Sequence, residues 1–188
     1  WLGLVGSEMC IRDRPAPPGF DYEKRGYVIS DSDISVYSRP EQGNHVLIGS
    51  EDPECDPRIF VDPDDWDDSF TDQWKVQVYR QAQRYPTLPV TTPVRGVTAL
   101  YDASDDWIPI YDKTDLPGFY VAIGTSGNQY KNAPVAGKLM AELIEKVEAG
   151  HDHDADPVQF HLENIDRTVS LGFYSRKRQI NTESSMSL

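Results

Sequence analysis

The sequence of 188 residues contains only two cysteines, Cys10 and Cys55. Two isolated cysteines cannot form a disulfide framework, which fits a reducing compartment. We therefore expect a cytoplasmic protein, or a mitochondrial matrix protein if the source is eukaryotic. The sequence also lacks a run of about 18 apolar residues, which excludes a membrane-spanning helix.

Positive charge is scarce as well: 18 Lys and Arg stand against 31 Asp and Glu, for a formal net charge of −13. A surface of this sign repels phosphate backbones and anionic lipids, which excludes nucleic acid and anionic membranes as partners. The acidic residues concentrate in residues 51–72, which we interpret as a solubilising surface. Residues 62–68 of this region lack the glycine and glutamate of a calcium loop. The His-Asp-His-Asp run of residues 151–154 could bind a metal, but it lacks cysteine and a defined frame and is interpreted as a solvated tail, so we predict no metal.

Aromatic residues, by contrast, are plentiful: the chain has ten Tyr, six Phe and four Trp. This content argues against disorder, and the length fits one domain or slightly more. The hydrophobic fraction of 38% is nevertheless low. We expect a folded but incomplete core, with apolar surface left where an N-terminal partner segment packs.

Hydrophobic periodicity predicts a mixture of strands and helices. Short apolar runs separated by turn signals predict an antiparallel meander in the first half of the chain. The predicted strands cover residues 27–30, 34–38, 45–49, 94–101, 107–111 and 119–123. The predicted helices cover residues 70–84, which Pro86 ends, and residues 132–149, which Gly150 ends.

The most informative segment is the turn between the predicted strand 119–123 and the last predicted helix. A glycine turn before a helix leaves backbone N–H groups unpaired at the positive end of the helix dipole. Such a group of donors suits an anion or an electron-rich carbonyl, and Lys131 adds a positive charge. Taken alone, an ordinary strand-to-helix turn is an equally good interpretation. The turn consists of Gly124, Thr125, Ser126, Gly127, Asn128 and Gln129.

Two blocks carry a family resemblance. Gly124, Ser126, Gly127, Asn128, Tyr130, Lys131 and Pro134 follow the pattern Gly-x-Ser-Gly-(His/Asn)-x-(Phe/Tyr)-Lys and a later Pro. Upstream, residues 99–112 contain a Ser-x-Asp sequence that ends at Asp106, followed by Pro109. Together the blocks resemble the C-terminal flavin-binding segment of the D-amino-acid oxidase superfamily, and within it the sarcosine oxidase, dimethylglycine dehydrogenase and glycine oxidase branch.

The resemblance implies a cofactor and a set of site residues. FAD is the expected cofactor, and Asp106 and the turn residues 124–129 are expected to contact the flavin. The backbone amides of the turn would stabilise the reduced flavin ring. Lys131 is expected to pair with a substrate carboxylate, Tyr37 to lie over the flavin, and Arg39 to bind a carboxylate through two hydrogen bonds. Each of these three has an alternative interpretation as an ordinary surface residue of a helix or strand.

Departures from the family pattern narrow the prediction. Ala99 stands where some members carry the cysteine that attaches flavin, so we expect non-covalent FAD. Leu47 stands nearest to the position where some oxidases of the family carry a lysine that activates oxygen. The absence of this lysine favours a dehydrogenase over an oxidase. The Gly-x-Gly-x-x-Gly dinucleotide motif is missing. Residues 1–14 look like a non-native, adapter-derived segment. The chain is therefore predicted to be the C-terminal portion of a larger flavoenzyme, with the N-terminal half as its partner.

These inferences give an α/β fold class: an α+β fragment with an antiparallel substrate-domain sheet, helices, and the last strands and helix of a Rossmann-like FAD-binding domain. The predicted parts are residues 1–14 (non-native), 15–95 (partial substrate-binding domain), 96–150 (C-terminal part of the FAD-binding domain) and 151–188 (polar tail).

The predicted function is oxidation of the C–N bond of a small N-methylated amino acid, such as sarcosine or dimethylglycine, by hydride transfer to FAD. The partners are a small amino-acid or amine substrate and an electron acceptor protein, and the fragment alone is expected to be inactive. Two alternatives stay open. One is a non-catalytic acidic binding module that kept the fold, and the other is a flavoenzyme for another small carboxylate substrate.

Overall fold

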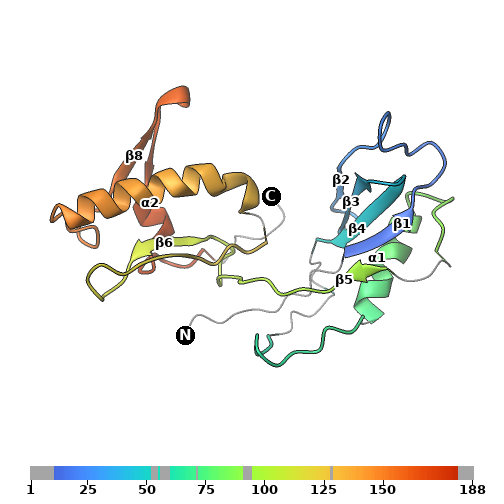
Figure 1. Cartoon of the computed structure of the whole chain (residues 1–188), viewed down its shortest axis with the longest axis horizontal. Coiled ribbons are helices and arrows are strands. Elements are labelled where there is room, and N and C mark those ends of the chain that lie inside the picture. Colours follow the sequence, from blue (N-terminus) through green and yellow to red (C-terminus); the bar gives the residue numbers. More distant parts are fainter. Residues whose placement is uncertain are drawn as a thin grey trace. The chain divides into compact units, whose positions relative to one another are not determined.

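The computed structural model describes residues 11–51, 55, 60–70, 72–90, 95–127 and 129–181, without the side chains of residues 11–13, 73 and 74. These residues divide after Tyr101 into two compact units, each with its own strands and helices (Figure 1). Every strand pair is antiparallel. The predicted α/β fold class, with antiparallel sheets and helices, is confirmed.

The first unit is a five-stranded sheet with one helix against one face (Figure 1). Its strand order is β2-β3-β4-β1-β5. The meander predicted over the first three strands of that order is present, within one to three residues of its predicted bounds. The elements are β1 (Ile11–Pro15), β2 (Ile29–Asp31), β3 (Val36–Glu41), β4 (His45–Ser50), α1 (Asp72–Ala82) and β5 (Gly96–Val97).

Strand register decides which side chains face α1. Val46 and Ile48 of β4 are fully buried and form a core with Val78 of α1 and with Phe20 and Leu88. Because successive side chains of a strand point to opposite faces, Leu47 and Gly49 lie on the other face. Tyr37 and Arg39 pair with them across β3 and β4 and share that face.

Two features of this unit correct the sequence analysis. Residues 11–14 were left out of the predicted fold, yet they form most of β1, which pairs with β4 on one side and β5 on the other. Backbone pairing on both sides and the burial of Arg14, 1% exposed, give this segment a place in the sheet. Of the strand predicted over residues 94–101, residue 94 lies outside the described residues, and within residues 95–101 only β5 is a strand, which joins the first unit. The division therefore falls after Tyr101, not after residue 95.

The second unit is built on a hairpin and a long helix, as predicted. Tyr111 on β6 packs against Leu139 and Leu143 of α2. Pro134 lies in the first turn of α2, where a missing N–H costs nothing, and Gly150 with φ +95° follows its end. The elements are β6 (Ile110–Lys113), β7 (Tyr120–Ile123), η1 (Tyr130–Asn132) and α2 (Ala133–Glu148).

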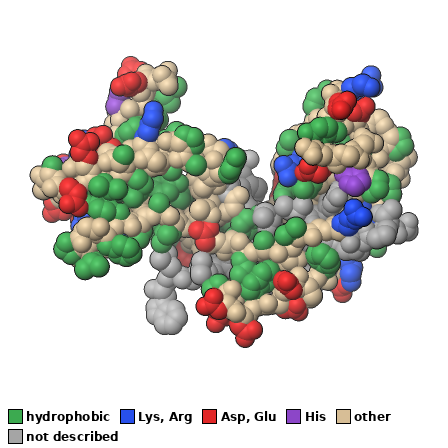
Figure 2. Space-filling view, viewed as in Figure 1, with side chains coloured by type: hydrophobic (Ala, Val, Ile, Leu, Met, Phe, Trp, Pro, Cys, Tyr) green, Lys and Arg blue, Asp and Glu red, His purple; other side chains and the backbone are tan. Residues whose placement is uncertain are grey.

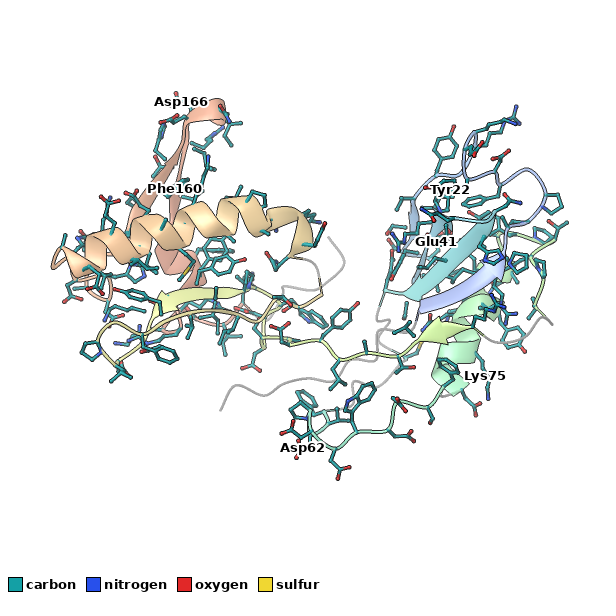
Figure 3. All side chains as sticks on the ribbon, viewed as in Figure 1. Tyr22, Glu41, Asp62, Lys75, Phe160 and Asp166 are labelled. Atoms are coloured by element: carbon teal, nitrogen blue, oxygen red, sulfur yellow. The ribbon has the colours of Figure 1, made fainter. Side chains whose placement is uncertain are left out.

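The residues after α2 are not the polar tail that the sequence analysis predicted. They form a second hairpin and two short helical turns, and Val158 and Leu171 are part of the core beneath α2. Phe160 lies toward the base of the hairpin and Asp166 at its tip (Figure 3). These elements are β8 (Gln159–Leu162), η2 (Glu163–Ile165), β9 (Arg167–Ser170) and η3 (Leu171–Tyr174). The apolar residues are too widely spaced to show periodicity, and much of the remaining packing uses charged groups.

Apolar side chains also remain on the surface of the second unit, over α2 and the hairpin beneath it (Figure 2). Leu116 is 65% exposed, Phe119 55% and Val135 43%. The low hydrophobic content of the chain predicts uncovered apolar surface, and this unit has such surface.

Candidate functional site

The glycine turn after β7 closes around a carboxylate of the same chain. Gly124, Ser126 and Gly127 have φ of +69°, +48° and +73°, a conformation that glycine adopts without strain. The amides of Gly124 and Thr125 donate to Asp102 Oδ2 at 3.1 and 3.0 Å, and the Thr125 hydroxyl donates to Asp102 Oδ1. The turn thus has the predicted property, donors converging on an anion. The anion, however, is Asp102, so these two amides are not available to a flavin carbonyl.

A second set of hydrogen bonds fixes the turn to the segment before β6. Ser126 is fully buried, and its amide donates to the Asp102 carbonyl at 3.3 Å. The Ser126 hydroxyl donates to the Gly124 carbonyl at 3.2 Å and accepts from the Ser104 amide at 3.3 Å. These hydrogen bonds therefore hold residues 102–104 and 124–126 in a fixed position relative to each other.

Asp106, the predicted cofactor-binding aspartate, is a buried structural ion. Its side chain is 1% exposed and forms a two-point ion pair with Arg178, Nη2 to Oδ1 at 2.5 Å and Nε to Oδ2 at 2.9 Å. The Ser104 hydroxyl and the Ile108 amide donate to its Oδ1, each at 3.2 Å. Burial by itself would raise the pKa of Asp106, but these hydrogen bonds and the Arg178 charge lower it to about 2.

Arg178 is the partner that sequence reasoning missed. Its guanidinium is 10% exposed and also donates to the Ile108 carbonyl at 2.7 Å and the Ser175 carbonyl at 3.1 Å. The only signal in the sequence was the basic run Arg176, Lys177 and Arg178 within a region interpreted as a solvated tail.

A second buried carboxylate ties the same C-terminal segment to β6. The side chain of Asp112 is 0% exposed and accepts from the Ser175 hydroxyl at 2.9 Å, the Arg176 amide at 2.7 Å and Arg176 Nη1 at 3.1 Å. His153 Nε2 lies 3.5 Å from Asp112 Oδ1, and His153 Nδ1 accepts from the Val158 amide at 3.1 Å. Burial lowers the pKa of His153 although Asp112 opposes this, so the imidazole is neutral with its proton on Nε2.

A groove of about 350 Å³ opens beside the Asp106–Arg178 pair. Its floor is the face of the hairpin opposite Tyr111, whose residues Ile110, Val121 and Ile123 are apolar. Ser104, Asp106, Arg176 and Arg178 form its polar rim, and the apolar Ile180 also lines it. All of these residues belong to the second unit.

The candidates that follow the turn are exposed. Lys131, in η1, pairs with no acidic group among the described residues, and its neighbour Tyr130 is 98% exposed. The side chain of Gln129 accepts from the Tyr111 hydroxyl at 3.1 Å, which anchors the start of η1 to the hairpin. Asn128 lies outside the described residues. The pairing of Lys131 with a substrate carboxylate stays a prediction.

Tyr37 and Arg39 lie on the sheet of the first unit, on the face opposite α1. The Tyr37 ring covers Gly49: a Cβ at position 49 would lie 2.3 Å from it. Arg39 is exposed and pairs with Glu41 at 3.4 Å. Leu47, 7% exposed, is the cross-strand neighbour of Arg39. The structure thus places both candidates on one face, while the turn and Lys131 belong to the other unit.

Within the residues that the structure describes, no group of three His, Cys, Asp or Glu side chains is placed to bind a metal ion. None of the described helices is both long and apolar enough to cross a membrane.

Comparison with known families decides the relationship. Residues 7–143 match the family described as FAD dependent oxidoreductase (DAO). The chain belongs to this family. The match includes both blocks of the candidate site and ends before the C-terminal segment that carries Arg176 and Arg178. FAD is the cofactor that the family implies. The narrower resemblance to the sarcosine oxidase branch stays a prediction.

Three solved structures share the fold. L-proline dehydrogenase from P. horikoshii has a TM-score of 0.59 at 17% identity, covering 78% of this chain and 37% of its own. Iminodiacetate oxidase from Chelativorans sp. BNC1 gives 0.52 at 18% identity, with 77% and 38% covered. Fructosyl amine: oxygen oxidoreductase from Aspergillus fumigatus gives 0.50 at 14%, with 77% and 36% covered. The chain thus spans less than two fifths of the length of each neighbour. No curated protein sequence matches it.

Fewer residues of the turn are available to contact a flavin than the sequence predicts. Asp102 occupies the amides of Gly124 and Thr125, and Ser126 is buried. Gly127 is exposed, has no side chain, and donates its amide to no other residue in the described part of the chain. It is therefore the described turn residue best suited to lie against a planar ring.

Proposed function

We propose that the whole protein is an FAD-dependent oxidoreductase that oxidises the C–N bond of a small amino acid or amine. The observation that carries this proposal is the family match over residues 7–143, which contains a turn held rigidly with Gly127 exposed at its tip. Bound FAD would supply the redox chemistry by accepting a hydride from the carbon beside the nitrogen. The dinucleotide-binding half would come from polypeptide beyond this chain, because the chain spans only 37% of the proline dehydrogenase.

The residues of this chain would position the cofactor and the substrate. Gly127, with Asn128 and Gln129, would lie at the flavin edge. Hydrogen bonds of Asp102 and Ser104, the latter held by Asp106, would keep the turn in place. Lys131 would bind the substrate carboxylate, since an ammonium group next to the turn has no competing acidic partner among the described residues. Tyr37 and Arg39, on the face of the sheet opposite α1, would serve as substrate-side groups.

The substrate class follows from the same proposal. The neighbours are named for L-proline, iminodiacetate and a fructosyl amine, all of which are amines. Within that class we propose a small N-methylated amino acid such as sarcosine or dimethylglycine. The electrons would pass to an acceptor protein, because Leu47 supplies no positive charge on β4 to stabilise superoxide. FAD would be non-covalent, because residue 99 is Ala.

One observation favours a second candidate, a non-catalytic module that kept the fold. Asp102 fills the donors of the turn with the chain's own carboxylate. In a module of this kind the turn would need no cofactor, and the whole protein would be purified without a flavin spectrum and would bind none when FAD is added.

The experiment that tests the proposal is anaerobic reduction of the whole protein with FAD, monitored by the loss of flavin absorbance. Sarcosine, dimethylglycine and L-proline are compared with matching amines that lack a carboxylate. We expect at least one of these amino acids to reduce the flavin. We also expect denaturation to release FAD, because the cofactor is proposed to be non-covalent. A protein that binds FAD but is reduced by no amine would overturn the proposed chemistry.

Lys131→Met probes the carboxylate contact. We expect its KM for the amino-acid substrate to rise on the order of 100-fold, with little change for the amine lacking a carboxylate, because one charge-assisted hydrogen bond is lost. Lys138→Met is the matched control, since Lys138 is also exposed and lies on α2. An unchanged KM in Lys131→Met would remove this residue from the substrate site.

A further inference from the structure

The geometry points to Arg178 as a positioning residue for the glycine turn, acting through Asp106 and Ser104 rather than touching flavin or substrate. The role in flavin binding rests on the proposed function. The role in holding the turn rests on contacts within the second unit alone. Arg178 lies outside the family match, which ends at residue 143.

A continuous series of hydrogen bonds connects Arg178 to the turn. Arg178 Nη2 contacts Asp106 Oδ1 at 2.5 Å, and the same carboxylate oxygen accepts from the Ser104 hydroxyl at 3.2 Å. The Ser104 amide then donates to the Ser126 hydroxyl at 3.3 Å. That hydroxyl donates to the Gly124 carbonyl at 3.2 Å. Three links therefore separate the guanidinium from the turn.

The charge of Arg178 is needed because Asp106 cannot reach solvent. The Asp106 side chain is 1% exposed, and its other donors are the Ser104 hydroxyl and the amides of Ile108 and Asn181, all without charge. Without the guanidinium, the carboxylate must take up a proton or move toward water. Either change weakens the acceptor that orients the Ser104 hydroxyl, and residues 102–106 lose their fixed relation to the turn.

Arg178 also holds the backbone on its own side. It donates to the Ile108 carbonyl at 2.7 Å. The single hydrogen of the Ser104 hydroxyl is shared between that carbonyl, at 2.7 Å, and Asp106 Oδ1, at 3.2 Å. The guanidinium thus fixes both acceptors of Ser104. Lysine at this position has a point charge without the planar fork, so it can replace the charge but not the two-point geometry.

The test compares Arg178→Gln and Arg178→Lys with the control Arg167→Gln in the whole protein. Arg167 lies on β9 of the same C-terminal segment, is exposed, and makes no ion pair in the described part of the chain. The first measurement is amide hydrogen exchange in residues 102–108 and 124–127 without cofactor. The second is the dissociation constant for FAD and the midpoint potential of the bound flavin.

We expect exchange in both segments to be roughly tenfold faster in Arg178→Gln, as for loss of one charge-assisted hydrogen bond, with Arg178→Lys in between and Arg167→Gln unchanged. The dissociation constant for FAD is expected to rise by about tenfold in the same order, with a shift in midpoint potential. Exchange in the β8–β9 hairpin serves as the internal reference, since a variant that merely destabilises the fold accelerates exchange there too.

Two outcomes overturn the inference. If Arg178→Gln leaves exchange at residues 124–127 unchanged, or accelerates it only together with the β8–β9 hairpin, Arg178 does not position the turn. If exchange changes but FAD affinity and potential do not, Arg178 holds the turn but has no role in flavin binding, and that part of the inference is overturned. A wild-type protein that binds no FAD is a different result: it refutes the proposed function, while the exchange data still decide the role of Arg178.

Discussion

The two units of the molecule bury their polar groups in different ways. In the first unit an apolar cluster forms the core between the sheet and α1, although Arg14, Gln77 and Gln81 are buried as well. The ion pair Arg84–Asp31, at 2.6 Å, leaves the arginine 44% exposed. In the second unit two carboxylates, Asp106 and Asp112, are 1% and 0% exposed, and each pairs with an arginine of the C-terminal segment.

This difference indicates what holds each unit together. Surface ion pairs contribute little, because water already solvates both partners. Breaking a buried pair is costly because it leaves one charge without water or a counterion. The exposed ion pairs described in the first unit therefore add little to its stability, whereas the second unit also depends on buried charge contacts that join the C-terminal segment to Asp112 of the hairpin and to Asp106.

The largest effect is expected from Asp112→Ala. The change removes the buried carboxylate that accepts from Ser175 and Arg176, which should lower the free energy of unfolding by about 4 kcal/mol. Chemical denaturation measures it. Asp115→Ala is the matched control, because Asp115 contacts the same Arg176 at 2.6 Å but is 87% exposed, and should have a far smaller effect. Equal losses in both variants would erase the contrast between buried and exposed pairs.

Acid should weaken the second unit through Asp106. The folded pKa is about 2 and the usual value 3.8, so the pair stabilises the fold above about pH 4 and loses this contribution as the pH falls through 2. The lowered pKa of Asp106 contributes about 2 kcal/mol to the free energy of unfolding at neutral pH, and about half of this contribution is lost by pH 3. Denaturation of the wild type and of Asp106→Asn between pH 7 and pH 2 measures it. A pH dependence that is the same in both proteins would contradict the assignment.

The smallest effect is expected from Arg84→Gln in the first unit. The hydrogen bond to Asp31 lowers the pKa of that carboxyl, but both groups are solvated, so the unfolding temperature should shift less than in Arg178→Gln. Thermal unfolding of the two variants under the same conditions tests the order. A larger shift for Arg84→Gln would mean that burial does not separate the two kinds of pair.

Local pattern was sufficient for most of the regular structure. The strand predicted at residues 45–49 is β4, His45–Ser50, and the helix predicted at residues 132–149 is α2, Ala133–Glu148. The strand has a short apolar run, the helix has apolar residues at helical spacing, and turn signals flank the run and end the helix. Neither β1 nor the C-terminal hairpin was predicted, the first because residues 1–14 were set aside and the second because its apolar residues follow no period.

The candidate site shows more clearly what cannot be predicted from local sequence. The turn was found because glycine and a helix start leave a local signature. That Asp102, rather than a cofactor, accepts from Gly124 and Thr125 depends on contacts across 22 and 23 positions. The Asp106–Arg178 pair joins residues 72 positions apart. Nothing in the local sequence of either residue encodes such a contact, because it forms only when the C-terminal segment folds back on the hairpin.

The most direct measurement of the central claim is hydrogen exchange of the Gly127 amide in the whole protein with and without FAD. If the tip of the turn lies against the flavin, exchange at Gly127 slows when FAD binds, while the amides of Gly124 and Thr125, already bonded to Asp102, change little. Binding of FAD without any change at Gly127 would contradict the account.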